Sequence, residues 1–256
     1  MPLNEPIRTW AAKRVWVVGE SQGIGAAVAR ALIEKHAKVA VSARSVDSRD
    51  ALARPGSTLV LPLDVTERTQ FPAALARIVA EWGGVDLVLL VAGTYKPVRA
   101  WELDDAVVRP MIETNLMGAL NALEAVVPQL LSQGSGGIGI VSSVAGYRGL
   151  PSGLIYGATK AALINLAETL YLDLRPRGLN VYLINPGFVK TPLTDQNEFK
   201  MPALISAEQA AREMLAGLER GEFEIHYPKR FTRLMKMLRI LPYSWYFKLV
   251  RRRTGL

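Results

Sequence analysis

Residues 15–25 read Val15-Trp16-Val17-Val18-Gly19-Glu20-Ser21-Gln22-Gly23-Ile24-Gly25 and lead into an alanine-rich segment at 26–35. An apolar run that turns through glycines into such a segment predicts a buried strand followed by a helix. Glycines at this junction let backbone N–H groups approach a pyrophosphate at the positive end of the helix. The alternative, an ordinary flexible turn, explains three glycines in seven residues less well. The stretch therefore predicts a dinucleotide-binding turn, in G-x-x-x-G-x-G rather than G-x-G-x-x-G spacing, formed by Gly19, Ser21, Gln22, Gly23, Ile24 and Gly25.

Short apolar runs alternate with helical patterns along the rest of the chain. We expect strands at 15–18, 38–42, 57–63, 86–91, 137–141, 179–184 and 223–227. Helices are expected at 24–35, 67–82, 104–131, 157–175 and 206–218, with a weaker one at 47–54. Strands this apolar are buried on both faces, and their alternation with helices indicates crossover connections. The fold class is therefore α/β, with a doubly wound, mainly parallel seven-stranded sheet and helices on both faces.

Composition excludes several classes of protein. The chain has 256 residues, half of them hydrophobic, which is ample for a packed core and excludes a disordered chain. It has no cysteine, so it forms no disulfide, thiolate metal site or cysteine nucleophile. With only His36 and His226 as histidines, we expect no metal site.

The net charge of +8 is concentrated at one end of the sequence. Residues 229–256 hold no acid and nine cations: Lys229, Arg230, Arg233, Lys236, Arg239, Lys248, Arg251, Arg252 and Arg253. The remaining 22 basic and 23 acidic side chains give residues 1–228 a charge of −1. We expect residues 1–228 to form a single catalytic domain and residues 229–256 a basic amphipathic extension. A neutral body argues against a nucleic-acid-binding protein.

No targeting segment is evident. The first residues mix polar, charged and aromatic side chains, and the longest apolar stretch of the body, at 87–92, is far shorter than the ~20 residues of a spanning helix. We expect a cytoplasmic protein.

The end of the second predicted strand bears on cofactor choice. Dinucleotide folds that prefer NAD usually place an acid there for the ribose 2′-hydroxyl, whereas an arginine accommodates a 2′-phosphate. Here Arg44 follows the strand, and no acid occurs until Asp47. The alternative is a solvated surface arginine. We predict a preference for NADP(H), with NAD(H) as the second possibility.

Tyr156 and Lys160 are spaced i and i+4 in a predicted helix, so their side chains share a face. An ammonium beside a phenol stabilises the phenolate and lowers the tyrosine pKa towards neutrality. Tyr156 then becomes a general acid or base. Taken alone, the pair would more often be a half-buried tyrosine beside a solvated lysine.

Further polar residues accompany this pair. Ser143 follows a strand, at the edge where a doubly wound sheet binds its ligands. Asn115 interrupts a predicted helix, and residues 185–191 form a turn after another strand. Singly, Ser143 and Asn115 would be read as local hydrogen-bonding residues.

The ordered set of motifs resembles the classical short-chain dehydrogenase/reductase (SDR) family, whose fold is Rossmann-type, from about residue 13 to residue 227. The resemblance implies a nicotinamide-dependent oxidoreductase that interconverts an alcohol and a carbonyl. Its implied catalytic set is Asn115, Ser143, Tyr156 and Lys160. Its implied cofactor contacts, besides the glycine turn and Arg44, are Asp64, Val65, Ala92, Gly93, Tyr156, Lys160, Pro186, Gly187, Val189 and Thr191.

The family also supplies a role for each of these side chains. Tyr156 would exchange a proton with the substrate oxygen and Ser143 would hydrogen-bond that oxygen. Lys160 would lower the Tyr156 pKa and bind the nicotinamide ribose, and Asn115 would hold a relay water. Asp64 would contact adenine, and Thr191 the carboxamide or phosphate region. The resemblance further implies a homodimer or homotetramer whose interface is built from 104–131 and 157–175.

Two positions depart from the family pattern. Val18 stands where a threonine is usual, and Val91 where an asparagine is usual. Both lie at the ends of strands expected to be neighbours. We therefore expect the two valines to lie together, an apolar contact having replaced a polar one.

The substrate wall is expected at 94–101, 147–151 and 188–202. Its apolar members would be Tyr95, Tyr147, Leu150, Phe188, Phe199 and Met201. An apolar carbonyl compound, such as a lipid, steroid or retinoid, fits this composition better than a sugar. Two other functions stay open: a non-catalytic nucleotide sensor on the same fold, and a membrane-surface scaffold.

The extension carries an apolar stripe at helical spacing. It comprises Phe231, Leu234, Met235, Leu238 and Leu241, before Pro242 breaks the pattern. Such a stripe more often packs on the body, covers the active site or contacts another subunit. The alternative is peripheral membrane contact, since cations flank the apolar side.

Overall fold

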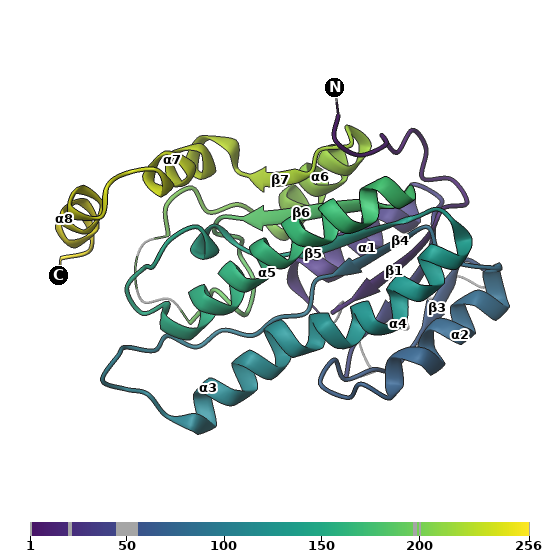
Figure 1. Ribbon diagram of the computed structural model, residues 1–256, viewed down its shortest axis with the longest axis horizontal. Coiled ribbons are helices and arrows are strands. Elements are labelled where there is room, and N and C mark those ends of the chain that lie inside the picture. Colours follow the sequence, from purple (N-terminus) through teal and green to yellow (C-terminus); the bar gives the residue numbers. More distant parts are fainter. Residues whose placement is uncertain (1, 20–21, 45–55, 197–198, 200, 256) are drawn as a thin grey trace.

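The computed structural model describes residues 2–19, 22–44, 56–196, 199 and 201–255, and a seven-stranded sheet lies at its centre (Figure 1). All neighbouring strands are parallel, in the order β3-β2-β1-β4-β5-β6-β7. The fold class predicted from the alternating pattern is confirmed. The strands are β1 Arg14–Val18, β2 Lys38–Ser42, β3 Thr58–Val60, β4 Leu87–Leu90, β5 Gly137–Val141, β6 Asn180–Pro186 and β7 Glu224–Tyr227.

Helices cover both faces of the sheet (Figure 1). One face packs against α1 and α6 through side chains such as Leu32 and Met214. The other packs against α2, α4 and α5 through side chains such as Phe71, Val126 and Leu163. The helices are α1 Gly23–Glu34, α2 Gln70–Trp82, α3 Asp105–Ile112, α4 Gly118–Gln133, α5 Leu154–Leu174, α6 Ala207–Glu219, α7 Lys229–Arg239 and α8 Tyr243–Thr254, with the short η2 Glu113–Met117, η3 Val144–Gly146 and η4 Arg175–Arg177.

Three expected elements differ from the structure. The helix expected at 104–131 is present over residues 105–133, but it contains the π-helical turn η2 between α3 and α4. A π turn inserts an extra residue, which side-chain periodicity does not reveal, and such turns are frequent at functional sites. The strand expected at 57–63 pairs only at Thr58–Val60. The weak helix at 47–54 lies outside the described residues.

The extension forms two helices, α7 and α8, joined at Pro242. Phe231, Met235 and Leu238 pack α7 against the core, whereas Leu234 of the same predicted stripe is 52% exposed. The predicted apolar stripe is therefore only partly buried against the body.

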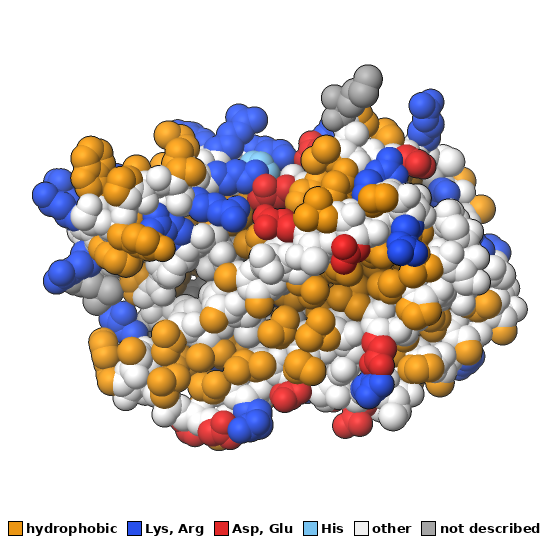
Figure 2. Space-filling view, in the orientation of Figure 1, with side chains coloured by type: hydrophobic (Ala, Val, Ile, Leu, Met, Phe, Trp, Pro, Cys, Tyr) orange, Lys and Arg blue, Asp and Glu red, His pale blue; other side chains and the backbone are white. Residues whose placement is uncertain are grey.

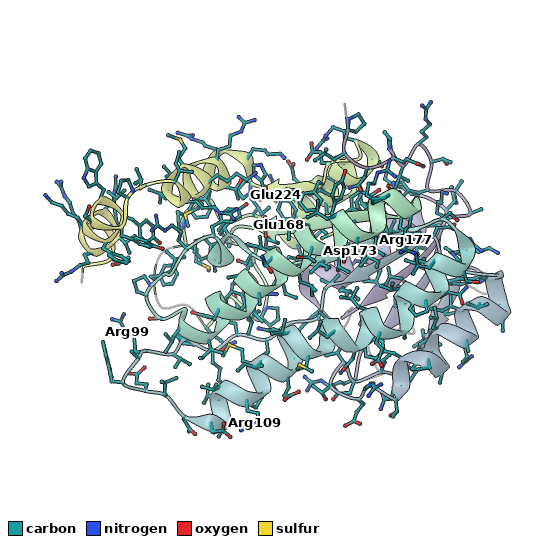
Figure 3. The ribbon with its side chains drawn as sticks, in the orientation of Figure 1. Arg99, Arg109, Glu168, Asp173, Arg177 and Glu224 are labelled. Atoms are coloured by element: carbon teal, nitrogen blue, oxygen red, sulfur yellow. The ribbon has the colours of Figure 1, made fainter. Side chains whose placement is uncertain are left out.

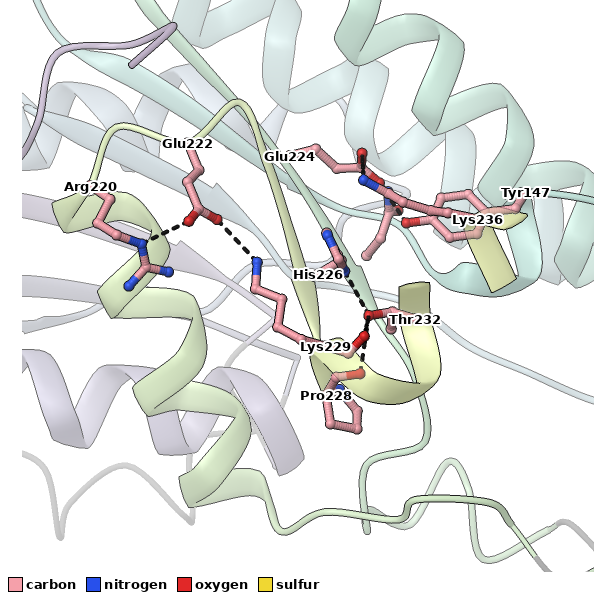
Figure 4. Close-up of polar contacts among 10 residues, drawn as sticks. Tyr147, Arg220, Glu222, Glu224, His226, Pro228, Lys229, Thr232 and Lys236 are labelled. Atoms are coloured by element: carbon pink, nitrogen blue, oxygen red, sulfur yellow. Dashed lines mark hydrogen bonds and ion pairs between the residues drawn. The ribbon is translucent and has the colours of Figure 1, made fainter. Parts of the chain in front are cut away.

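A buried polar contact fixes the start of α7 on the last strand (Figure 4). The Thr232 hydroxyl donates to the Pro228 carbonyl and lies 2.6 Å from Nδ1 of His226. Burial lowers the pKa of His226 to about 4, so its ring is neutral at physiological pH. The first turn of the extension is therefore held by an uncharged contact.

Candidate active site

A cleft of about 470 Å³ opens where the parallel strands end, and it brings most of the expected site residues together. Ligands bind at this edge of doubly wound sheets. Of the expected residues, the lining contains Gly19, Gln22, Gly23, Ile24, Arg44, Asp64, Val65, Ala92, Gly93, Ser143, Tyr156, Lys160, Pro186, Gly187, Val189 and Thr191. Gly25 is buried within α1, and Asn115 lines a small neighbouring cavity. Ser21 lies outside the described residues.

The glycine turn suits the phosphates of a dinucleotide. Gly19 has φ +98°, and a Cβ on it would lie 2.3 Å from the backbone nitrogen of Ala92. Gly23 has φ +62°, and its Cβ would lie 2.8 Å from Cγ2 of Thr191. Neither position accepts a side chain without strain. Because Gly19 and Gly23 present only backbone to the cleft, a pyrophosphate can approach the N–H groups at the start of α1.

The two valines that depart from the family pattern are neighbours. The backbone N–H of Val91 donates to the Val18 carbonyl at 2.8 Å, and that of Ala92 donates to the same oxygen at 3.0 Å. Val18 itself is buried. The ends of β1 and β4 are thus joined by backbone bonds, which need neither of the usual polar side chains. The expected apolar contact between the two side chains is wrong, because Val18 packs in the core on one face of the sheet and Val91 against the core on the other.

Tyr156 and Lys160 project from α5 onto one wall of the cleft. The Lys160 ammonium lies 5.6 Å from the centre of the Tyr156 ring and donates to the Val141 carbonyl at 3.0 Å. Ser143 lies at the start of η3, where its hydroxyl accepts from the Ala145 N–H at 3.1 Å. The three catalytic candidates therefore converge at the cleft wall.

The electrostatics differ from the sequence-based expectation for Tyr156. Burial raises the pKa of Tyr156 to about 12, and the hydrogen bond with Ser143 acts in the opposite direction without offsetting it. Burial also lowers the pKa of Lys160 to about 8. The expected fall of the Tyr156 pKa towards neutrality is not what this structure gives, because desolvation outweighs the hydrogen bond with Ser143. The Lys160 ammonium is hydrogen-bonded to the Val141 carbonyl. Tyr156 thus keeps its proton at neutral pH.

Asn115 acts as a strut between two elements of the site. It lies in η2 and is buried. Its amide oxygen accepts from the Thr94 N–H at 2.7 Å, and its amide nitrogen donates to the Thr94 carbonyl at 3.0 Å and to the Thr159 hydroxyl at 3.2 Å. The π turn therefore ties the loop after β4 to α5, beside Lys160.

The segment after β5 is pressed against the backbone of α5 at Lys160. The Ser142 hydroxyl donates to the Lys160 carbonyl at 2.7 Å. A Cβ on Gly146 would lie 2.7 Å from the Lys160 carbonyl carbon and 2.8 Å from its oxygen. We call these two contacts, of Ser142 and Gly146 with the Lys160 backbone, the clasp. The clasp fixes Ser143, which lies between Ser142 and Gly146, relative to Tyr156. Sequence reasoning missed both clasp residues, although the Ser-Ser and Ala-Gly pairs flanking Ser143 are visible there.

The expected wall segments 94–101 and 188–202 do reach the cleft, but the apolar side chains expected in them do not line it. Among the described lining residues of the cleft, none of the six apolar candidates occurs. Tyr147 instead donates from its hydroxyl to Glu224 at 2.5 Å, and Phe188 packs on other aromatic rings. Tyr95 alone reaches the site, with its ring edge-on to Tyr156 at 5.0 Å between centres. The expected wall segment 188–202 contributes other residues to the cleft, namely Pro192, Leu193, Thr194 and Gln196, whereas Pro110 and Thr114 lie outside the expected segments.

Glu224 links the extension to the loop after Ser143 and to β6 (Figure 4). Its carboxylate accepts from the Tyr147 hydroxyl, from the Asn185 amide at 2.9 Å and from the Lys236 ammonium at 2.5 Å. Burial acts to raise the pKa of Glu224, but hydrogen bonds, first that of Lys236, outweigh it and lower the pKa. One carboxylate therefore joins the loop after Ser143, the end of β6 and α7.

Arg148 holds the junction between α7 and α8. Its guanidinium donates to the Leu241 carbonyl at 2.6 Å and lies 4.6 Å and 4.2 Å from the ring centres of Tyr243 and Tyr246. The Tyr246 hydroxyl in turn donates to the Gly149 carbonyl at 2.7 Å. Both helices of the extension are thus anchored on the segment that follows Ser143.

Within the described residues, no group of three His, Cys, Asp or Glu side chains could hold a metal ion.

Comparison with known proteins gives consistent results. The model of the short chain dehydrogenase family matches residues 13–201. An uncharacterized oxidoreductase of Myxococcus xanthus is 37% identical over 231 residues, which cover 88% of this chain and 91% of that one. A 3-oxoacyl-[acyl-carrier-protein] reductase of Thermotoga maritima is 29% identical over 81% of this chain and 82% of its own. A short chain dehydrogenase of Burkholderia cenocepacia, solved in complex with NADP, superposes with a TM-score of 0.84 at 25% identity, over 94% of this chain and 99% of that chain.

Gly146→Ala tests the clasp on α5. The added methyl meets backbone atoms that cannot move aside, so we expect kcat to fall about tenfold or more and stability to fall by ~1–3 kcal/mol. Steady-state kinetics and thermal unfolding measure the two effects. The matched control is Gly149→Ala on the same loop, where a Cβ meets nothing within 4 Å. Equal kcat in the two variants would contradict the assigned role of the clasp.

Proposed function

Because the chain belongs to the short-chain dehydrogenase family of oxidoreductases, we propose that it interconverts a carbonyl compound and an alcohol with NADP(H) as the hydride carrier. Residues 1–228 would form the catalytic domain. The observation that carries the proposal is the convergence of Ser143, Tyr156 and Lys160 on the cleft that the glycine turn enters. The nicotinamide, when bound, supplies or accepts the hydride.

The chain's own residues supply position and protons. Tyr156 would donate its proton to the carbonyl oxygen of the substrate, and its raised pKa is consistent with a general-acid role. Ser143 would hydrogen-bond the same oxygen and polarise the carbonyl. Lys160 would hold the ribose beside the nicotinamide and stabilise the phenolate left after proton transfer. Asn115 would keep the loop after β4 against α5.

The preference for NADP(H) is supported by Arg44. Its side chain is exposed and lines the cleft at the end of β2, where a ribose 2′-phosphate would lie. Asp47, the first acid after it, lies outside the described residues. The Burkholderia cenocepacia relative was solved with NADP.

An apolar or amphipathic carbonyl substrate is supported by a few contacts. Tyr95 packs edge-on against Tyr156, and Pro110, Pro192 and Leu193 contribute apolar surface to the cleft. The Thermotoga maritima relative is named for a 3-oxoacyl substrate, which combines a ketone with an acyl chain.

The two alternative functions have less support. A nucleotide sensor has no need of the Ser143, Tyr156 and Lys160 arrangement. A scaffold that uses only the extension leaves the cleft unexplained. Membrane association and catalysis can coexist in one protein, so we treat the extension separately below.

A homodimer or homotetramer is supported by apolar surface on the helices expected at the interface. Figure 2 shows hydrophobic side chains gathered over α4 and α5. The exposed ones near this face are Ile112, Met117, Leu120, Leu131 and Leu172.

Tyr156→Phe tests the proton-transfer step. Removing the hydroxyl should lower kcat by about 10²–10⁴-fold while the dissociation constant for NADPH stays unchanged. NADPH oxidation with a panel of apolar ketones and aldehydes measures the first quantity, and fluorescence titration the second. A variant that keeps full turnover, or whose biological effect persists without turnover, would favour the sensor.

Arg44→Ala tests cofactor preference. Loss of a charge-assisted hydrogen bond to a 2′-phosphate costs about 1.5–3 kcal/mol, so KM for NADPH should rise about 10–100-fold while KM for NADH changes little. The matched control is Arg177→Ala, an exposed arginine on η4 outside the cleft. A native enzyme that prefers NADH would overturn the assignment.

Leu172→Glu tests the oligomer. Leu172 is 71% exposed on α5, so a charge there should leave folding intact but split the assembly into smaller species in light scattering. Leu3→Glu, at a 55% exposed position outside these helices, is the control. An unchanged mass for Leu172→Glu would place the interface elsewhere.

A further inference from the structure

The extension has two sides with different surroundings. Towards the body, α7 packs Met235 into the core and α8 buries Tyr246 beside Arg148. Away from the body, large apolar side chains remain exposed on both helices. Their exposed fractions are 52% for Leu234, 65% for Met237, 82% for Ile240, 71% for Tyr243, 68% for Trp245 and 54% for Phe247.

Cations surround these apolar side chains (Figure 2). Residues 229–256 hold nine Lys and Arg side chains, of which Lys229 pairs with Glu222 and Lys236 pairs with Glu224. The other seven form no ion pair with any residue that the structure describes: Arg230, Arg233, Arg239, Lys248, Arg251, Arg252 and Arg253.

The extension lies at the end of the molecule where the strands terminate and the cleft opens. Figure 1 places α7, α8 and the loop leading into α3 together at that end, and Figure 3 shows Arg99 of this loop there. The loop carries two more exposed apolar side chains, Trp101 at 77% and Leu103 at 58%, and the Arg99 guanidinium lies 5.2 Å from the Trp101 ring. Apolar groups and cations are therefore exposed together on several segments at this end of the molecule.

We propose that the exposed side of α7 and α8 is a docking surface for an anionic lipid bilayer. Exposed aromatic and aliphatic groups would enter the region between headgroups and acyl chains, where tryptophan and tyrosine are favoured. The cations without an ion pair, apart from Arg239 over the Tyr147 ring, would meet lipid phosphates. Attachment is peripheral, since no helix in the described part of the chain is long and apolar enough to cross a membrane. This inference goes beyond the proposed reaction, because it concerns where the enzyme works.

Charge favours a membrane over two other occupants. A second copy of the chain offers either a body of net charge −1 or another extension of +9, and neither complements seven unpaired cations. Nucleic acid would neutralise the cations but would leave Met237 and Ile240 in water, since phosphates do not bury aliphatic groups. An anionic bilayer satisfies both kinds of side chain together.

Vesicle flotation tests the proposal with the full-length protein. Point variants are preferable to truncation, because Arg148, Glu224 and Gly187 of the body pack on the extension. Vesicles of phosphatidylcholine mixed with phosphatidylglycerol should carry the wild-type protein upward, those of phosphatidylcholine alone far less, and added salt should weaken the binding.

Two variants separate the contributions. Met237→Ser/Ile240→Ser/Trp245→Ser should weaken binding to the anionic vesicles about tenfold or more. Arg251→Gln/Arg252→Gln/Arg253→Gln should weaken it about 100-fold and reduce the preference for anionic lipid. Leu3→Ser, an exposed apolar residue outside the extension, is the control and should float like wild type. Because all these side chains are exposed, circular dichroism should show every variant folded.

Several outcomes would overturn the proposal. Wild type that does not float with anionic vesicles would do so, as would equal flotation of wild type and both triple variants. Binding to duplex DNA without binding to vesicles would assign the surface to nucleic acid. A loss of oligomer mass in Met237→Ser/Ile240→Ser/Trp245→Ser without vesicle binding would assign it to a second copy.

Discussion

The backbone of α5 at Lys160 is the contact on which the rest of the site depends. Ser142 hydrogen-bonds to its carbonyl, and Gly146 approaches it so closely that no side chain could be accommodated. The positions of the residues that follow β5 depend on this close contact with α5. Ser143 is set against Tyr156 on one side, and Tyr147 and Arg148 are turned towards the extension on the other. A displacement of α5 by the width of a methyl group would disturb both at once.

The sequence predicted the sheet because parallel strands buried on both faces leave a strong signal. Runs such as residues 38–42 and 137–141 match β2 and β5 residue for residue, and all seven strands occur in the structure. The π turn within the helix expected at 104–131 left no such signal, because a π turn changes backbone spacing without changing residue type. Asn115 was selected from the family pattern, yet its role as a strut depends on three hydrogen bonds that the pattern does not contain.

The sequence predicted the residues that line the cleft more accurately than the residues that surround it. The glycines, Ser143, Tyr156 and Lys160 are local features of strand ends and one helix, so their place could be inferred from the fold class. The aromatic residues of the substrate wall could not be placed in this way. Tyr147 contacts Glu224 on β7 and Phe188 contacts Phe231 on α7, two residues far along the chain that local sequence patterns do not bring to the site. Net charge likewise separated the extension from the body but did not reveal its second helix after Pro242.

The seat of α7 also limits how the extension could be redesigned. A Cβ on Gly187 would lie 2.9 Å from the Phe231 ring, so a glycine at the end of β6 leaves the room that α7 occupies. Arg148 and Glu224 complete the seat, the guanidinium through Leu241 and Tyr243 and the carboxylate through Lys236. Residues 229–256 are therefore not an interchangeable cassette. Grafting them onto another enzyme of this fold would require the recipient to carry the same glycine, arginine and glutamate at the matching positions.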